Sequence, residues 1–227
     1  MDAYLIYILE DDAGKESLQI KGELHKYLVK VRRHSEGDKL NFRSRKDIKT
    51  MHTYKVLHVE PRAMKLSLVS SKTLEVKAKK YLHVAWCVID MKSVEKVLPS
   101  LCEIGVDKIT FISCERSQKN FKIDFKRFER IIEASMQQSG RTSYIEFDTS
   151  RCIKDFVDSN PSTKVFDFCD NTLEDSSNID TVLIGCEGGF SSNEREILKD
   201  LDSFRLDSPM VLRSESAVMA VASKILV

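Results

Sequence analysis

The sequence predicts an α/β protein in two domains: a small β-rich domain over residues 1–80 and an α/β domain with a mostly parallel sheet over residues 81–227. The first part has short runs of aromatic and branched residues that are broken by turn residues, which is typical of strands. The second part alternates apolar runs with stretches of helical period, which indicates parallel strands joined by helices. The charge also divides there, with a net charge of +7 in the first domain and −6 in the second.

The first domain is predicted to be a small β-barrel. A short helix is expected over residues 25–33, in which Tyr27, Leu28 and Val31 share an apolar face. Breaks fall at Gly37-Asp38 and Pro61-Arg62. The predicted strands are YLIYILE (4–10), DKLNF (38–42), TYKVLHVE (53–60) and MKLSLVS (64–70).

The second domain opens with LHVAWCVID (82–90), an apolar run suited to a strand that is buried on both faces. The helical period over 91–105 ends at Gly105, a plausible C-cap, and Pro99 is expected to kink or split this helix. A second helix is predicted over 125–140. The remaining predicted strands are KITFISC (108–114), YIEF (144–147), KVFDFC (164–169), TVLIGC (181–186) and FRL (204–206).

Composition narrows the class of protein. No apolar run approaches the ~20 residues needed to cross a bilayer. The N-terminus is acidic, and its apolar run is too short for a secretory signal. A cytoplasmic protein is therefore expected. The six cysteines are scattered without a CxxC pair, which favours reduced thiols over disulfides or zinc ligands. All five histidines fall in the first 83 residues, so chemistry in the second domain has to proceed with little or no imidazole.

The stretch LIGCEGGFSSNEREIL (183–198) places Gly185, Gly188 and Gly189 between a strand and a helix. Glycines at such a transition allow a ligand to approach the backbone, although an ordinary tight turn has the same composition. The spacing fits neither the dinucleotide-binding fingerprint nor a phosphate-binding P-loop. A capping box over 191–194 defines the start of the following helix.

The chain ends with VLRSESA (211–217) and an apolar helix rich in small residues. Arg213 and Glu215 stand where this helix begins. The residues by themselves are compatible with a helix cap and a salt bridge, or with a functional site. Likewise, the basic first domain suits a polyanionic partner, but a solvated surface with no partner has the same charge.

Taken in order, these segments resemble the RsmE family, the ribosomal RNA uridine N3-methyltransferases of the SPOUT superfamily. The glycine loop and the Leu-Arg-x-Glu segment are the specific parts of a resemblance that extends over nearly the whole chain. His25, Val29, Arg32 and Gly37-Asp38 also look like the opening domain of that family. The matching stretches are Cys114–Ser117, Gln137–Arg141, Leu183–Glu194 and Val211–Ala217.

Two positions depart from the family pattern. Cys186 stands where the family usually has proline in the glycine loop, which softens the loop only slightly. The helix that ends at Gly105 lacks the family's lysine, so no role is carried over from that lysine.

The resemblance implies a PUA-like β-barrel followed by a SPOUT domain with a trefoil knot over roughly residues 164–227. S-adenosyl-L-methionine would lie where three loops gather, and no metal is implied. The enzyme would be a homodimer whose partner surface includes Ala217, Val218, Ala220, Val221, Ala222 and Ile225. The implied cofactor-binding residues are Gly185, Glu187, Gly188, Gly189, Leu206, Leu212 and Ser214.

The implied reaction is methylation of N3 of a uridine in 16S ribosomal RNA of the small subunit. Arg213 would stabilise negative charge on the uracil, and Glu215 would orient Arg213 or accept a proton. Arg116 and Arg141 would contact phosphate or base. The first domain would hold RNA phosphates through Lys26, Lys30, Arg32, Arg33, Arg43, Arg45 and Lys46.

Three alternatives stay open at this point. The glycine loop does not exclude another ribosomal or transfer RNA position as the target. An RNA-binding assembly factor without activity is disfavoured by the intact glycines and the intact Leu-Arg-x-Glu segment. A nucleotide-binding protein of different chemistry is disfavoured because the glycine loop has no phosphate-binding lysine.

Overall fold

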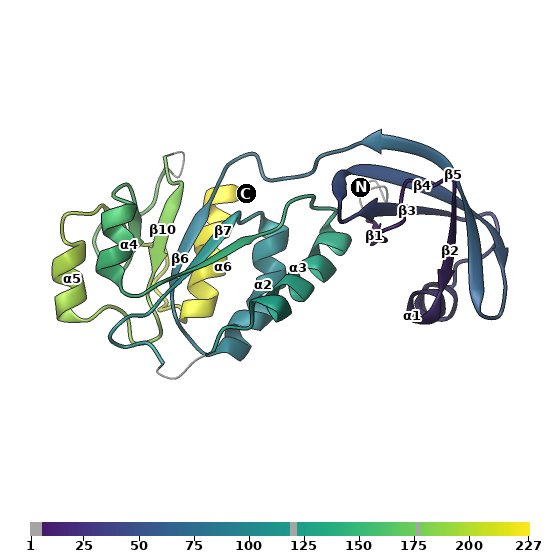
Figure 1. Cartoon of the computed structure of the whole chain (residues 1–227). Helices are drawn as coiled ribbons and strands as arrows, with labels where there is room; N and C mark the ends of the chain where they lie inside the picture. Colours follow the sequence, from purple (N-terminus) through teal and green to yellow (C-terminus); the bar gives the residue numbers. More distant parts are fainter. Residues whose placement is uncertain (1–5, 119–121, 176–177) are drawn as a thin grey trace. The chain divides into compact units, whose positions relative to one another are not determined.

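A computed structural model describes residues 6–118, 122–175 and 178–227. The chain forms two compact units (Figure 1). The first unit comprises Met1–Lys77 together with Met136–Ser143, and the second comprises Ala78–Ser135 with Tyr144–Val227. The boundary therefore falls three residues before the expected one, and a later segment of the chain returns to the first unit.

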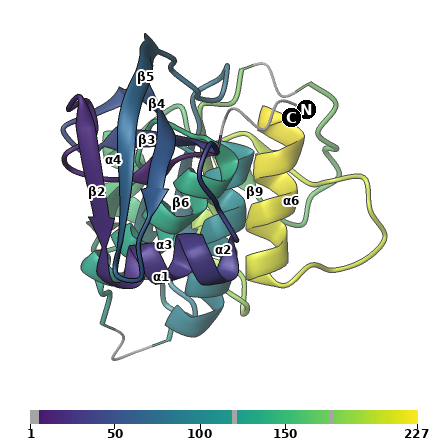
Figure 2. The same cartoon turned by 90° about the vertical axis from the view of Figure 1, so that its right-hand side faces the viewer.

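The first unit is built on a curled sheet whose described strands run in the order β1-β3-β4-β5-β2 (Figure 2). β1 and β3 are parallel, and the other pairs are antiparallel. Within the described residues β1 and β2 stand at opposite ends, so the expected barrel is an open half-barrel. Residues 4–5 of the first predicted strand lie outside the described residues, and β2 had not been predicted. The bounds are β1 Ile8–Leu9, β2 Ser17–Lys21, β3 Lys39–Ser44, β4 Asp47–Val59 and β5 Ala63–Thr73.

A helical segment follows β2, as predicted, but its apolar face differs from the expected one. It starts as α1 (Gly22–Lys26) and continues as a π-helix, η1 (Tyr27–Val31), in which the Arg32 amide donates to the Tyr27 carbonyl. Leu28 is buried in the core, but Tyr27 is 41% exposed and Val31 is 65% exposed. The expected face is wrong because the wider π-turn changes the angle between successive side chains.

The second unit contains a parallel sheet whose described strands run in the order β11-β9-β10-β6-β7-β8. This confirms the predicted α/β architecture. β6 is buried along its whole length, as expected for a central strand that is covered on both faces. The bounds are β6 His83–Cys87, β7 Lys108–Ile112, β8 Glu146–Ser150, β9 Lys164–Phe166, β10 Thr181–Ile184 and β11 Ser203–Phe204.

Helices cover both faces of this sheet, with α2, α3 and α6 on one side and α4 and α5 on the other (Figure 1). α2 is continuous through Pro99, so the expectation of a split helix is wrong, and Gly105 is its C-cap. α4 had not been predicted from the sequence. The bounds are α2 Met91–Ile104, α3 Phe125–Ser139, α4 Ile153–Ser159, α5 Ser192–Leu198 and α6 Ser214–Leu226. No helix of the described residues is long and apolar enough to cross a membrane.

The apolar side of α6 is used mainly within the chain. α6 packs against α2, β6 and β10. Of the six residues expected on a dimer surface, five are buried in this packing and Ala220 alone remains half-buried. The expectation that this face is free for a partner is therefore wrong for most of its residues, since the sheet already covers them.

His83 begins β6 inside the core of the second unit. Its Nε2 lies 2.7 Å from the Thr110 hydroxyl, and its ring meets the Phe156 ring edge-on. Burial disfavours the imidazolium form and, with the nearby positive charge of Lys108, lowers the pKa of His83 to about 4. The native protein therefore takes up this proton at lower pH than the unfolded chain does.

We expect the protein to lose stability as the pH falls from 6.5 towards 4, because the unfolded state binds the His83 proton first. Between pH 7 and pH 5 this group alone should remove about 2 kcal/mol from the free energy of unfolding. Urea denaturation at the two pH values measures the loss. His83→Gln should make the dependence on pH shallower, and His58→Gln, at an exposed position, is the matched control. An unchanged slope in His83→Gln would contradict the assignment.

Candidate functional site

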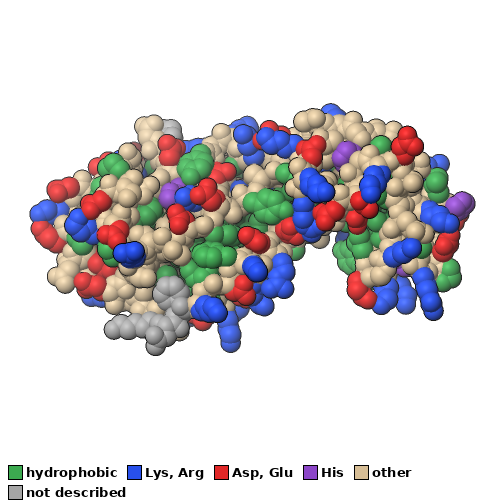
Figure 3. Space-filling model, in the orientation of Figure 1, with side chains coloured by type: hydrophobic (Ala, Val, Ile, Leu, Met, Phe, Trp, Pro, Cys, Tyr) green, Lys and Arg blue, Asp and Glu red, His purple; other side chains and the backbone are tan. Residues whose placement is uncertain are grey.

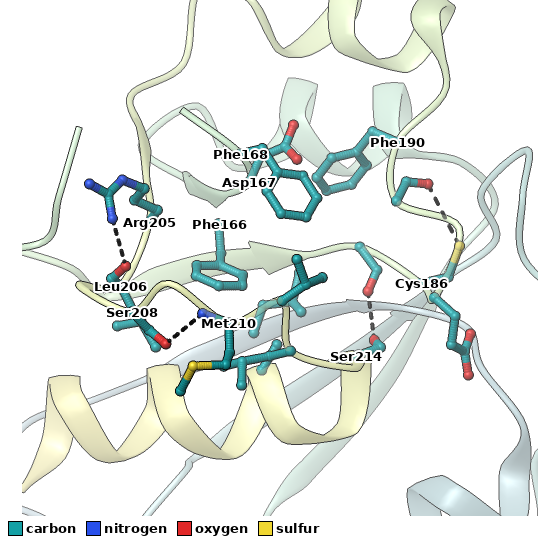
Figure 4. Close-up of a pocket in the computed structure, with 17 residues that line it drawn as sticks. Phe166, Asp167, Phe168, Cys186, Phe190, Arg205, Leu206, Ser208, Met210 and Ser214 are labelled. Atoms are coloured by element: carbon teal, nitrogen blue, oxygen red, sulfur yellow. Dashed lines mark hydrogen bonds between the residues drawn. The ribbon is translucent and has the colours of Figure 1, made fainter. Parts of the chain in front are cut away.

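A pocket opens at the carboxyl ends of β9 and β10, where three segments of the second unit gather (Figure 4). They are the end of β9 (residues 166–168), the glycine loop (residues 185–189) and the segment 205–212 that precedes α6. The pocket is a cavity of about 150 Å³ that is partly open to solvent. The glycine loop and the loop before Leu212 border this pocket as expected, but its third side comes from residues 166–168, which lie within the predicted strand KVFDFC and not in the loop after it.

The pocket is mostly apolar. Figure 4 shows the rings of Phe168 and Phe190 on one side and Ser208 and Met210 on the other. Phe168 and Met210 are also strongly exposed, which is unusual for large apolar side chains. Of the expected cofactor-binding residues, six line the pocket: Gly185, Glu187, Gly189, Leu206, Leu212 and Ser214.

Gly188, the seventh expected cofactor-binding residue, is not among the described residues that line the pocket. A Cβ at this position would lie 3.2 Å from Cβ of Arg116, so the glycine leaves room for the Arg116 side chain. Arg116 in turn donates from Nη1 to the Gly188 carbonyl at 2.7 Å. Gly189 has a φ of 62°, in the left-handed region that favours glycine.

The Ser214 hydroxyl connects the glycine loop to β6 through two hydrogen bonds. It accepts a hydrogen bond from Nε1 of Trp86 at 2.8 Å and donates to the Gly185 carbonyl at 2.6 Å. Ser214 and Trp86 are both buried. One hydroxyl therefore joins β6, the glycine loop and the first turn of α6. No sequence signal indicated that Trp86 takes part.

The capping box predicted over 191–194 is present, and it carries a further contact. The Glu194 carboxylate accepts from the backbone amide of Ser191 at 2.8 Å and from that of Glu115 at 2.7 Å. Glu194 is buried, so this carboxylate holds the segment after β7 against the start of α5. Together with the Arg116–Gly188 contact, it fixes the outer side of the glycine loop.

The two expected catalytic residues flank Ser214 at the start of α6. Arg213 is the N-cap residue and is exposed, whereas Glu215 lies in the first turn and is half-buried. Within the described residues neither lines the pocket, but their neighbours Leu212 and Ser214 do. Both residues are therefore neighbours of the described lining in the sequence without being part of it.

Sequence reasoning missed several residues that line the pocket, and for most of them the sequence carries no specific signal. Arg205 donates to the Leu206 carbonyl, and the Met210 amide donates to the Ser208 hydroxyl, so segment 205–212 is held by local contacts. Their positions depend on how the three segments meet in space. The lining residues that were not predicted are Phe166, Asp167, Phe168, Ile184, Cys186, Phe190, Arg205, Ser208, Met210, Val211 and Ala217.

The basic residues of the first unit divide into exposed and buried groups. Exposed cations gather on α1, η1 and the residues that follow, where Figure 3 shows Lys and Arg side chains on one face. We call these four residues the basic helical surface: Lys26, Lys30, Arg32 and Arg33. Arg45 and Lys46 are exposed on the turn between β3 and β4, and Arg45 pairs with Asp11 at 3.1 Å.

Two of the expected RNA contacts are contradicted by burial. Arg43 is fully buried, donates to the Ile48 carbonyl at 2.7 Å and lies over the Tyr7 ring, so its guanidinium supports the first unit. Arg141 is also buried, and its Nε donates to the Ser143 carbonyl at 2.7 Å. Neither side chain is available to an RNA phosphate. The sequence does not distinguish such buried arginines from surface ones.

Comparison with known proteins decides the family. The model of an RNA methyltransferase domain matches residues 76–226. A ribosomal RNA small subunit methyltransferase E from Helicobacter pylori is 37% identical over 215 residues, which cover 93% of this chain and 95% of that protein. The chain belongs to the RsmE family. A member of the same name from Aquifex aeolicus is 28% identical over 145 residues, covering 60% of this chain and 63% of that protein.

Solved structures share the RsmE fold over nearly the whole chain. A methyltransferase from Legionella pneumophila, solved with bound SAM, has a TM-score of 0.75 at 22% identity and covers 97% of this chain and 95% of its own. An RsmE from Neisseria gonorrhoeae, bound to S-adenosyl methionine, has a TM-score of 0.75 at 15% identity, with coverage of 97% and 96%. At these identities the likeness establishes the fold, and the expected RsmE architecture is confirmed.

We expect Ser214→Ala to destabilise the second unit by about 2 kcal/mol, because it leaves the Trp86 indole N–H and the Gly185 carbonyl buried without their shared partner. Denaturation followed by Trp86 fluorescence measures the loss, since Trp86 is the single tryptophan. Ser216→Ala, two residues along the same helix, is the matched control and should change stability by less than about 0.5 kcal/mol. We call the two hydrogen bonds of the Ser214 hydroxyl the Ser214 relay. Equal stability of the two variants would show that this relay contributes little to the free energy of unfolding.

Proposed function

We propose that this chain transfers a methyl group from S-adenosyl-L-methionine to N3 of a uridine in 16S RNA of the small ribosomal subunit. The observation that carries the proposal is the pocket formed by the glycine loop and segment 205–212, in a chain that belongs to the RsmE family. Two structural neighbours were solved with this cofactor. The choice of N3 rests on the resemblance of the sequence motifs to the family.

The pocket residues fit such a cofactor. Apolar side chains at Leu206, Leu212 and Phe190 offer a surface for an adenine ring, and backbone groups of the glycine loop lie beside them. The cofactor would supply an electrophilic methyl group on a sulfonium. Because recognition is largely through the main chain, the shape of the loop matters more than its side chains.

N3 of uracil carries a proton that has to leave before or during methyl transfer. Arg213, exposed at the rim of the pocket, would stabilise the negative charge that develops on the uracil oxygens. Glu215, two residues after Arg213 in the first turn of α6, would orient Arg213 or accept the proton. Arg116, held on the outer side of the glycine loop, would contact the RNA beside the target base.

The first unit would bind RNA phosphates through the basic helical surface and through Arg45 and Lys46. Such contacts position a nucleic acid without reading its sequence. The target base would leave its stack to reach the pocket. The buried Arg43 and Arg141 have no part in this binding.

We further propose a homodimer formed through the surface around the pocket mouth. Phe168, Met210 and Val211 are 70%, 68% and 75% exposed, and such a cluster of large apolar side chains is typical of a protein interface. In this proposal the exposed surface takes the place of the α6 face as the dimer contact, because most of that face is buried within the chain. Ala220, which is half-buried, is the one residue of the α6 face that stays partly accessible.

We expect Arg213→Ala to lower the methylation rate about 100-fold or more, since a positioned charge at the reacting group is lost. Mass spectrometry of nucleosides from small-subunit RNA, incubated with protein and cofactor, measures the product. Cofactor affinity, measured by calorimetry, should stay within about twofold. Lys154→Ala, an exposed basic residue on α4, is the control. Full activity of Arg213→Ala would remove Arg213 from the mechanism, and a product other than N3-methyluridine would refute the proposed position.

We expect Arg32→Glu combined with Arg33→Glu to weaken RNA binding and to flatten its salt dependence by about one unit of slope per lost phosphate contact. Filter binding of small-subunit RNA over a range of salt concentrations measures both quantities. Arg62→Glu combined with Lys72→Glu reverses two exposed charges outside the basic helical surface and controls for net charge. If both variants lose affinity for the RNA equally, the basic helical surface does not bind RNA in preference to other exposed charges.

We expect the protein to be a dimer at micromolar concentration and Val211→Asp to shift it towards monomer, because a carboxylate would be buried in the contact. Light scattering coupled to size exclusion measures the mass. Val69→Asp alters an exposed apolar residue of the first unit and should leave the mass unchanged. A monomeric parent protein would refute the dimer.

A further inference from the structure

Three cysteines that are far apart in the sequence meet beneath the glycine loop. Cys87 ends β6, Cys114 follows β7 by two residues, and Cys186 follows β10 by two residues. Because β10, β6 and β7 are neighbouring parallel strands, their carboxyl ends lie side by side. The Sγ atoms of Cys114 and Cys186 are 3.5 Å apart.

The environments of these thiols differ. Cys114 is half-buried, and its Sγ lies 2.9 Å from the Ser117 hydroxyl. Hydrogen bonds from Cys186, Cys87 and Ser117 favour the thiolate and lower the pKa of Cys114 well below its usual value. The same neighbouring thiolate, together with burial, raises the pKa of Cys186. A thiolate beside a thiol is the arrangement that favours thiol oxidation.

We propose that Cys114 and Cys186 are an oxidation site, and that a reversible disulfide between them weakens ligand binding in the adjoining pocket. With hydrogen peroxide as oxidant, the Cys114 thiolate attacks one peroxide oxygen, the O–O bond breaks, and protonation of the departing hydroxide gives Cys114 sulfenic acid and water. The Cys186 sulfur then attacks the Cys114 sulfur, the S–O bond breaks, and the Cys186 proton leaves with the oxygen as a second water. Two electrons pass from the two sulfurs to the peroxide, and a thiol reductant reverses the change.

The bond would act on the pocket through the backbone of the glycine loop. The Sγ–Sγ distance has to shorten from 3.5 Å to about 2.05 Å. Cys186 lines the pocket, and its carbonyl accepts from the Gly189 amide at 2.9 Å, so a shift of Cys186 moves the turn that follows. The preceding residue, Gly185, is fixed by Ser214. The loop is therefore distorted between a fixed end and a displaced one.

Cys87 is the competing partner for Cys114. It is fully buried at the end of β6, where every residue of the strand is buried in the sheet. Cys186, in contrast, belongs to a loop that borders open space. The disulfide is thus assigned to the pair that joins the two loops, since the loop is freer to move than the central strand.

The experiment treats the full-length protein with hydrogen peroxide and maps disulfides by mass spectrometry without reduction. We expect a cross-linked peptide pair that contains Cys114 and Cys186 and disappears after dithiothreitol. Calorimetry with S-adenosyl-L-methionine should then show affinity at least about tenfold weaker in the oxidised protein, recovered on reduction. The affinity measurement rests on the proposed function, whereas the peptide map does not, so failure of one is distinguishable from failure of the other.

Variants keep each part of the proposal open to refutation. Cys114→Ser and Cys186→Ser should each abolish the cross-link and the difference between oxidised and reduced affinity. Cys169→Ser, which alters another half-buried thiol outside the cluster, should preserve both. A Cys87–Cys114 cross-link, or oxidation without any cross-link, would overturn the assignment. A Cys114–Cys186 disulfide with unchanged affinity would overturn its effect on the pocket.

Discussion

The hydrogen bonds of the Ser214 hydroxyl are the contact on which the pocket depends. A single buried oxygen satisfies the Trp86 indole N–H and the Gly185 carbonyl, and it does so at the point where α6 starts. Ser214 is 128 residues from Trp86 and 29 from Gly185. Such a buried donor and acceptor are costly to leave unpaired, so the relay fixes where the glycine loop and the helix stand relative to the sheet. Segment 205–212 then has to approach the loop, because it leads directly into Ser214.

The position of the pocket depends on the order of the strands as much as on the Ser214 relay. β9, β10, β6 and β7 are consecutive in the parallel sheet, so their carboxyl ends form one edge. The loops that leave this edge carry the pocket, the Arg116 contact and the thiol cluster. The edge of an open parallel sheet is where α/β proteins bind ligands, and here side chains from widely separated segments meet there because the topology requires it.

Periodicity and capping signals predicted most elements of the second unit, since these signals are local. The helices at 91–105 and 125–140, the capping box and the glycine loop all lie where the sequence placed them. Features that depend on non-local packing were not predicted. The π-turn of η1 turned Tyr27 and Val31 outward, Arg43 was placed on the surface although it is buried, and the contact of Gly188 with Arg116 had no signal in the sequence. For Arg43 and Gly188 the deciding neighbour comes from another segment of the chain, whereas the π-turn is a local departure from α-helical geometry.

The glycine loop is shaped from outside the pocket. Ser214 fixes the Gly185 carbonyl, Arg116 holds the Gly188 carbonyl, and the Cys186 thiol lies against Cys114. In the proposed function the loop binds its ligand through the main chain, so these outer contacts, which set the shape of the loop, would influence the affinity. The segment after β7 supplies two of the three. If the pocket binds the cofactor as proposed, changes in residues 114–116, which lie outside its described lining, should alter the affinity without touching the ligand.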